Sequence, residues 1–174
     1  MGKLAFRGLV LTLAIGLLGL GSYAIAGDGT KNFSGALNGY EENPDISTVA
    51  SGSFEARLSD DGTSLHYALS YSGLEGTVQQ AHVHFGKRAV NGGVSFFLCT
   101  NMNTATDDDC PQSGTVEGDI EAADVIGPTG QGIEAGNLAE ILAAMRAGRA
   151  YANVHSSKWP GGEIRAQLND KRES

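Results

Sequence analysis

Apolar and polar residues alternate over much of the chain, which is the pattern of strands that bury one face. The clearest pair of alternating runs spans residues 53–58 and 64–71, separated by the turn sequence Asp60-Asp61-Gly62. Turns of this composition commonly join antiparallel strands. The pattern therefore predicts a β-hairpin whose inward side chains are Phe54, Ala56, Leu58, Leu65, Tyr67, Leu69 and Tyr71.

Further strands are predicted where short alternating or apolar runs end at glycine-rich turns. They span residues 33–37, 77–85, 94–98, 114–120, 150–155 and 163–168. One short helix is predicted before the last two strands, since Asn137 can cap it, Gly148 can end it, and apolar residues recur at helical spacing in between: Leu138, Ile141, Leu142 and Met145. The pattern predicts an all-β protein of about seven or eight short strands, with a β-sandwich favoured over a closed antiparallel barrel.

The first 26 residues have the features of a signal peptide. Lys3 and Arg7 begin it, residues 9–20 are almost unbroken apolar sequence, and residues 24–26 have the small-x-small form of a cleavage site. An uncleaved membrane anchor is the alternative, although the apolar segment is short for a spanning helix. We expect residues 27–32 to be an N-terminal extension, residues 33–168 to be one domain, and residues 169–174 to be a charged tail.

The net charge indicates which classes of partner the protein can bind, and the cysteines indicate the redox state of its compartment. Removing the first 26 of 174 residues leaves 148, and removes 2 of the 12 basic residues and none of the 20 acidic ones, so the formal charge becomes −10. This charge opposes binding to nucleic acids or anionic membranes and favours cations. In an exported protein Cys99 and Cys110 most simply form a disulfide, with a metal-binding thiolate pair as the alternative.

Three of the four histidines lie in two short strand motifs. His82 and His84 are two residues apart and share one face of a strand, while His155 shares a face with Tyr151 and Asn153. If the two strands are neighbours, three imidazoles converge, and imidazole is the commonest protein ligand for transition metals. The pattern thus indicates a three-histidine site for copper or zinc.

The alternation leaves the fourth ligand open. His66, Glu163, an aspartate or water are the candidates. The histidines also have a metal-free interpretation, in which they join Asn153, Glu163 and Arg165 in a structural hydrogen-bond network. Arg165 has the chemistry to pair with the carboxylate of Glu41 or Glu42 in such a network.

An ordered set of motifs resembles the CHRD domain, which is named for a module of chordin. The motifs are Glu42-Asn43-Pro44, Gly73-Leu74, residues 81–86 (AHVHFG), residues 147–155 (AGRAYANVH) and residues 160–168 (PGGEIRAQL). The resemblance covers residues 33–168, and Ala166 departs from it where the family commonly has glycine. It implies an immunoglobulin-like antiparallel β-sandwich and an exported protein, periplasmic or secreted, and it does not imply an enzyme.

Three functional hypotheses follow. The first is an exported binding protein that holds copper or zinc through His82, His84 and His155 for storage, delivery or structure. The second is a metal-free interaction module of the cell envelope or extracellular space, with an unknown protein partner. The third and lowest-ranked is a metalloenzyme, which needs an acid or base such as Glu163 or His66 near an open metal position. No residues are assigned a catalytic role.

Overall fold

A computed structural model describes residues 31–102 and 108–168 of the chain. The predicted signal peptide, most of the N-terminal extension and the charged tail lie outside these residues. The described strands are β1 (Asn32–Asn38), β2 (Ser51–Leu58), β3 (Ser64–Ser72), β4 (Val78–Phe85), β5 (Gly93–Thr100), β6 (Gly114–Glu121), β7 (Ala150–Ser156) and β8 (Ile164–Gln167). The prediction of an all-β protein with about eight short strands is confirmed.

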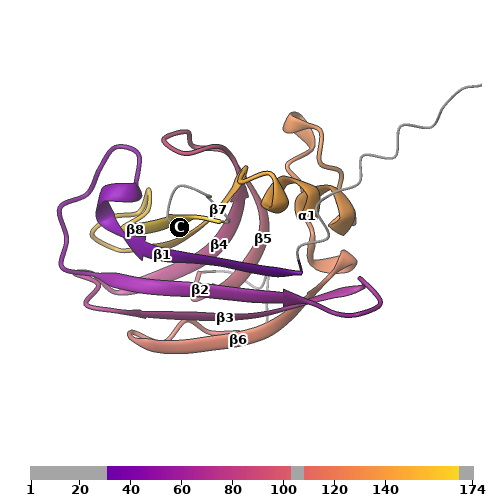
Figure 1. The fold of residues 1–174 in the computed structure, drawn as a ribbon. Helices are drawn as coiled ribbons and strands as arrows, with labels where there is room; N and C mark the ends of the chain where they lie inside the picture. Colours follow the sequence, from indigo (N-terminus) through magenta and orange to yellow (C-terminus); the bar gives the residue numbers. More distant parts are fainter. Residues whose placement is uncertain (1–30, 103–107, 169–174) are drawn as a thin grey trace, which may run out of the picture.

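The strands form one antiparallel sheet in the order β5-β4-β7-β8-β1-β2-β3-β6. The sheet curls, so that the wall of β1, β2, β3 and β6 faces the wall of β8, β7, β4 and β5 (Figure 1). The Tyr67 hydroxyl on β3 donates a 2.5 Å hydrogen bond to the Leu98 carbonyl on β5, which ties the two walls together. The arrangement is close to a barrel.

The expected immunoglobulin-like sandwich is therefore not confirmed, because β8 joins β1 and makes the two walls one sheet. Alternation fixes which side chains point into the core, and it does so equally in a sandwich and in a curled sheet. The strand order decides between them, and it depends on long-range pairings that a local pattern does not specify.

The predicted hairpin is confirmed as β2 and β3. Phe54 pairs with Leu69 and Ala56 with Tyr67, and all four side chains are buried. Gly62 in the connecting turn has a φ of 76°, in the left-handed region that glycine adopts at little cost. Burial of the alternate apolar side chains on each strand fixes this register, since a slip of one residue would expose them.

The predicted helix is α1 (Leu138–Arg146), whose N-terminus is capped by the Asn137 side chain accepting from the Glu140 backbone N–H. Its apolar face is buried, and it lies at one end of the curled sheet (Figure 1). Three short 3₁₀ helices, η1 (Gly39–Glu41), η2 (Ala122–Asp124) and η3 (Thr129–Gln131), occur in the connections. No helix within residues 31–102 and 108–168 combines the length and apolarity needed to cross a membrane.

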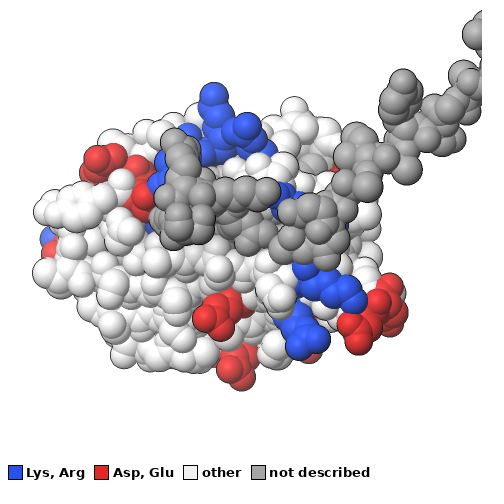
Figure 2. Space-filling view, viewed as in Figure 1, with Lys and Arg blue, Asp and Glu red and all other residues white. Residues whose placement is uncertain are grey.

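The two faces of the sheet have different surroundings. Side chains on the inner face form the hydrophobic core, which includes Ala81 and Val83 of β4 and Ala152 and Val154 of β7. On the surface shown in Figure 2, basic and acidic side chains lie beside one another among uncharged residues. The outer face of β4, β7 and β8 is not part of this exposed surface, because its polar side chains are buried beneath connecting segments.

Candidate metal centre

Two neighbouring strands bring three histidines to one place. β4 and β7 pair antiparallel, with His82 opposite Asn153, His84 opposite Tyr151, and Gln80 opposite His155. Since Ala81 and Val83 take the inner face, the histidines occupy the outer one. One nitrogen of each of His82, His84 and His155 lies within 4.8 Å of the others, which is the convergence that the sequence predicts if the strands are neighbours.

The rings are close enough for shared coordination. His82 Nδ1 and His84 Nε2 are 3.1 Å apart, and the ring centroids of His82 and His155 are 4.6 Å apart. Bonds of about 2.0–2.1 Å around a tetrahedral zinc ion place ligand nitrogens about 3.4 Å from one another. His82 and His84 are thus slightly closer than this separation, and all three donors lie within 4.8 Å of one another, so modest side-chain adjustments would bring them around one ion.

Two of the histidines are oriented by backbone carbonyls. His84 Nδ1 lies 3.0 Å from the Gly92 carbonyl oxygen, and His155 Nδ1 lies 3.0 Å from the Pro160 carbonyl oxygen. A carbonyl can only accept, so each Nδ1 carries the proton and each Nε2 is left with a lone pair. Metal-binding histidines are typically held in this way, with the second ring nitrogen donating to a carbonyl or carboxylate.

Burial keeps the imidazoles in the form that binds metal. The exposed fractions are 3% for His82, 8% for His84 and 6% for His155. Burial, with the neighbouring His155 and His84, lowers the pKa of His82 to about 2; burial also lowers the pKa of His84 to about 4 and lowers that of His155. Neutral rings with free lone pairs are the species that coordinate transition metals.

Aromatic rings and a buried arginine form one wall of the site. Tyr151 stacks on His84 with a centroid distance of 4.7 Å and an interplanar angle of 1°, and the Arg165 guanidinium carbon lies 3.4 Å from the Tyr151 ring centroid. Phe97 meets His82 edge-on at 4.8 Å. Tyr151 and Phe97 were not among the predicted site residues, although Tyr151 shares the outward face of its strand with Asn153 and His155.

Arg165 fixes the segment of residues 87–92, which passes over the site. It donates to the carbonyls of Lys87 and Val90, each at 3.1 Å, and to Asn91 Oδ1 at 3.4 Å. The same segment supplies the Gly92 carbonyl that orients His84. Arg165 thus holds residues 87–92 mainly through two of their backbone carbonyls. Of its two suggested carboxylate partners, Glu41 instead forms an ion pair with Arg88.

Glu42 and Asn153 form the polar floor of the site. The Asn153 amide donates to Glu42 Oε1 at 3.5 Å, and Arg165 acts on Glu42 electrostatically. Burial raises the pKa of Glu42 to about 7, against the lowering effects of Arg165 and Asn153. The structure therefore brings together three members of the suggested polar network: Glu42, Asn153 and Arg165.

Glu163 is buried but points to a different set of partners. Its carboxylate accepts from the Thr48 hydroxyl and the Glu75 backbone N–H, each at 2.8 Å, and from the Ser156 hydroxyl. It precedes β8 and follows Gly162, whose φ is 126°, so the alternation of β8 does not extend to it. The group of converging donors found among the described residues does not include it.

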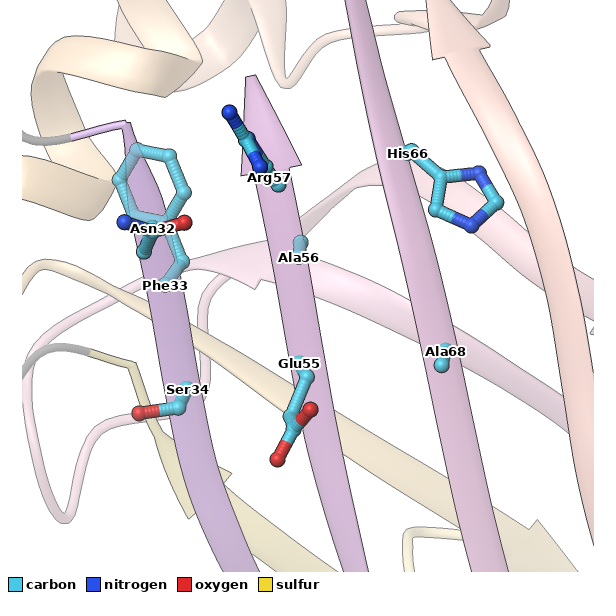
Figure 3. A pocket seen from close by; sticks show the side chains of 8 residues that line it. All are labelled: Asn32, Phe33, Ser34, Glu55, Ala56, Arg57, His66 and Ala68. Carbon is cyan, nitrogen blue, oxygen red and sulfur yellow. The ribbon is translucent and has the colours of Figure 1, made fainter. Parts of the chain in front are cut away.

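His66 lies on the outer face of β3, far along the sheet order from β4. It is exposed, and its Nδ1 is 3.2 Å from Asp119 Oδ1 on β6. With Glu55 and Arg57 it lines an open hollow of about 380 Å³ over β1, β2 and β3 (Figure 3). The structure does not bring His66 to the other three histidines.

The two cysteines are joined as expected. The Cys99 and Cys110 sulfur atoms are 2.05 Å apart, so they are paired with each other and not available as metal ligands. Cys99 lies on β5, the neighbour of β4, and both residues are buried in the core. The bridge closes the connection between β5 and β6.

Comparison with known proteins assigns the chain to a family. The family model of the CHRD domain matches residues 33–168, which include nearly all of the described chain. Comparison with curated proteins gave no match, and comparison with solved structures also gave none. The match to the family model covers all the strands except the first residue of β1, together with the histidines and their supporting segments. The chain therefore belongs to the CHRD domain family.

Proposed function

We propose that this protein is an exported binding module that holds one transition metal ion, copper or zinc, through His82, His84 and His155. The observation that carries the proposal is the convergence of three buried imidazole nitrogens within 4.8 Å. The anchoring of His84 and His155 through Nδ1 to carbonyls supports it, because it places the ring proton on Nδ1 and leaves Nε2 of each ring with a lone pair. Imidazole ligands suit copper and zinc.

The proposed role is storage, delivery or a structural use of the ion. All three rings are at least nine-tenths buried, which suits retention of an ion more than turnover of a substrate. Export is part of the proposal. It is supported by the signal-peptide features of residues 1–26 and by the disulfide, which is typical of proteins outside the cytosol.

The test is metal stoichiometry of the mature protein. We expect titration calorimetry and elemental analysis at pH 7.5 to give one copper or zinc ion per chain for the wild type and none for the His82→Ala/His84→Ala variant. His66→Ala is the matched control, since it removes an exposed histidine outside the cluster and should bind like the wild type. Equal, substoichiometric uptake by the wild type and the double variant would refute the proposal.

The metal-free interaction module is the second candidate, and one observation favours it. His82 with His84, His84 with Gly92, and His155 with Asn153 and Pro160 are all within hydrogen-bonding distance without an ion. A purely structural network predicts that the histidine variants lose stability equally with and without chelator. A melting temperature of the wild type that rises with added Cu²⁺ or Zn²⁺ would favour the metal site, because binding to the folded state alone stabilises it.

A further inference from the structure

Asn153 lies at the centre of the three histidines. It is opposite His82 on β4, is 3% exposed, and its Oδ1 is 3.0 Å from His155 Nε2. From the sequence, Asn153 was assigned to the structural hydrogen-bond network, and the candidates for a fourth ligand were His66, Glu163, an aspartate or water.

The other end of the amide is held in place. Asn153 Nδ2 donates to Glu42 Oε1, and the backbone of Gly162 lies directly over both groups. A Cβ added at Gly162 would lie 2.5 Å from Glu42 Oε1 and 2.7 Å from Asn153 Nδ2, so there is no room for even a methyl group. With Nδ2 directed to an acidic partner, Oδ1 must face the histidines.

His155 has two neighbouring oxygen acceptors, but a neutral imidazole has only one N–H to donate. A neutral imidazole carries a single N–H, and His155 has an oxygen 3.0 Å from each ring nitrogen, the Pro160 carbonyl and Asn153 Oδ1. The Pro160 carbonyl can only accept, and so can Asn153 Oδ1 while Nδ2 faces Glu42. One of the two contacts therefore brings two lone pairs together, which is unfavourable without a cation between them.

A metal ion placed against His155 Nε2 and Asn153 Oδ1 removes this conflict. We infer that Asn153 Oδ1 is the fourth donor of the site, completing a set of three imidazole nitrogens and one amide oxygen. This inference rests on the proposed function and deepens it. A donor set of nitrogen and oxygen without sulfur favours Cu²⁺ or Zn²⁺ over Cu⁺, which prefers thiolate and thioether ligands.

The first arm of the test compares metal affinity across three variants. We expect Asn153→Ala to weaken binding of Cu²⁺ and Zn²⁺ at least tenfold and His155→Ala to weaken it more. Asn32→Ala is the matched control, because Asn32 is an exposed asparagine on β1 that lines the open hollow beside His66, and its loss should leave affinity unchanged.

The second arm uses the wild type and so does not depend on a variant folding. On titration with Zn²⁺, we expect the side-chain carbonyl carbon of Asn153 to shift in the NMR spectrum as its oxygen coordinates, with saturation at one equivalent, while that of Asn32 on the open face stays in place. X-ray absorption of the Cu²⁺ form should show three imidazoles and one further oxygen, and that oxygen should be replaced or lost in Asn153→Ala.

The outcomes separate this inference from the proposed function. If the wild type binds no metal, both fail. If the wild type binds one ion, His155→Ala does not, and the Asn153 carbonyl carbon is unmoved by Zn²⁺, the three-histidine site stands and the fourth donor is wrong. In that case the amide of the metal-free protein is reversed, with Nδ2 donating to His155 Nε2 and a protonated Glu42 donating to Oδ1. If Asn153→Ala does not fold, the shift of the wild-type carbonyl carbon decides.

Discussion

The outer face of the sheet has two regions with outward-pointing histidines, and these regions differ in how far their histidines are exposed. Over β4, β7 and β8, connecting segments cover the histidines, which are buried and in contact with one another. Over β1, β2 and β3 the face is open (Figure 3). His66 is exposed there, with its Nδ1 3.2 Å from Asp119 Oδ1. Both regions have the same period-two pattern in the sequence. Strand alternation places polar residues on the outer face, and the difference shows that covering segments are also needed to bury them and bring them together as a candidate site.

The largest expected difference between the two regions is in pH dependence. Histidines of the unfolded chain titrate near pH 6.5, whereas in the folded protein burial lowers the pKa of His84 to about 4 and of His82 to about 2. Between these limits the unfolded state binds more protons, so the free energy of unfolding of the metal-free protein falls as pH drops from 6.5. We expect His84 alone to account for about 3 kcal/mol by pH 4, measured by urea denaturation.

Protonation of Glu42 has the opposite effect on the free energy of unfolding. Its pKa is raised to about 7, so the folded state takes up its proton first and is stabilised as pH falls from 7 toward 4.5. One carboxyl does not offset three histidines, so the net stability should still fall. His84→Gln should reduce the slope between pH 6.5 and 4.5. An unchanged slope in His84→Gln would contradict the buried neutral ring.

The second comparison concerns arginines. Arg165 is 1% exposed and donates to two carbonyls and one amide oxygen of residues 87–92, whereas Arg57 is an exposed residue on the open face. Arg165→Met keeps much of the side-chain volume but leaves these acceptors without a donor. We expect it to lower the free energy of unfolding by about 2–4 kcal/mol and to weaken metal binding.

Arg57→Met is the control for this prediction. A surface substitution of this kind should change the free energy of unfolding by at most about 0.5 kcal/mol. Guanidinium chloride denaturation of both variants measures the difference. Similar small losses for the two would show that residues 87–92 are held over the site by other contacts.

The smallest expected effect distinguishes two glycines with positive φ. Gly162 (φ 126°) is pressed against Glu42 and Asn153, while Gly62 (φ 76°) in the β2–β3 turn has nothing within 4 Å of the position of an added Cβ. Gly62→Ala should cost about 1 kcal/mol of stability from backbone conformation alone. Gly162→Ala should cost about 2 kcal/mol or more, since steric displacement adds to the same backbone effect.

Metal binding provides an independent readout for the glycine pair. Gly162→Ala should weaken binding, because the displaced groups include the Asn153 amide, and Gly62→Ala should not. Thermal melts and calorimetric titrations of both variants give the two quantities. Equal stability losses with equal metal affinity would mean that Gly162 matters only as a turn residue.

Several features of the site could be predicted before any tertiary information. Alternation placed His82 and His84 on one face and Ala81 and Val83 on the other, as the structure has them. The same reasoning put Glu163 on the face of Arg165, but Glu163 lies at a bend before β8 and its carboxylate accepts from the Ser156 hydroxyl. His66 had the same outward position as the site histidines, and only its location in the sheet separates it from them.

Local sequence patterns predicted the strands, the helix with its Asn137 cap, the inward and outward sides of the strands that carry the histidines, and the family motifs within residues 33–168. These are local properties, set by backbone geometry and by the burial of apolar side chains. Three outcomes come from tertiary contacts: β8 joins β1 to make one curled sheet, β4 lies beside β7, and Gly92 and Gly162 lie against His84 and Asn153, respectively. Those outcomes depend on contacts between distant segments, and they bring the three imidazoles within 4.8 Å of one another and the Asn153 amide against His155.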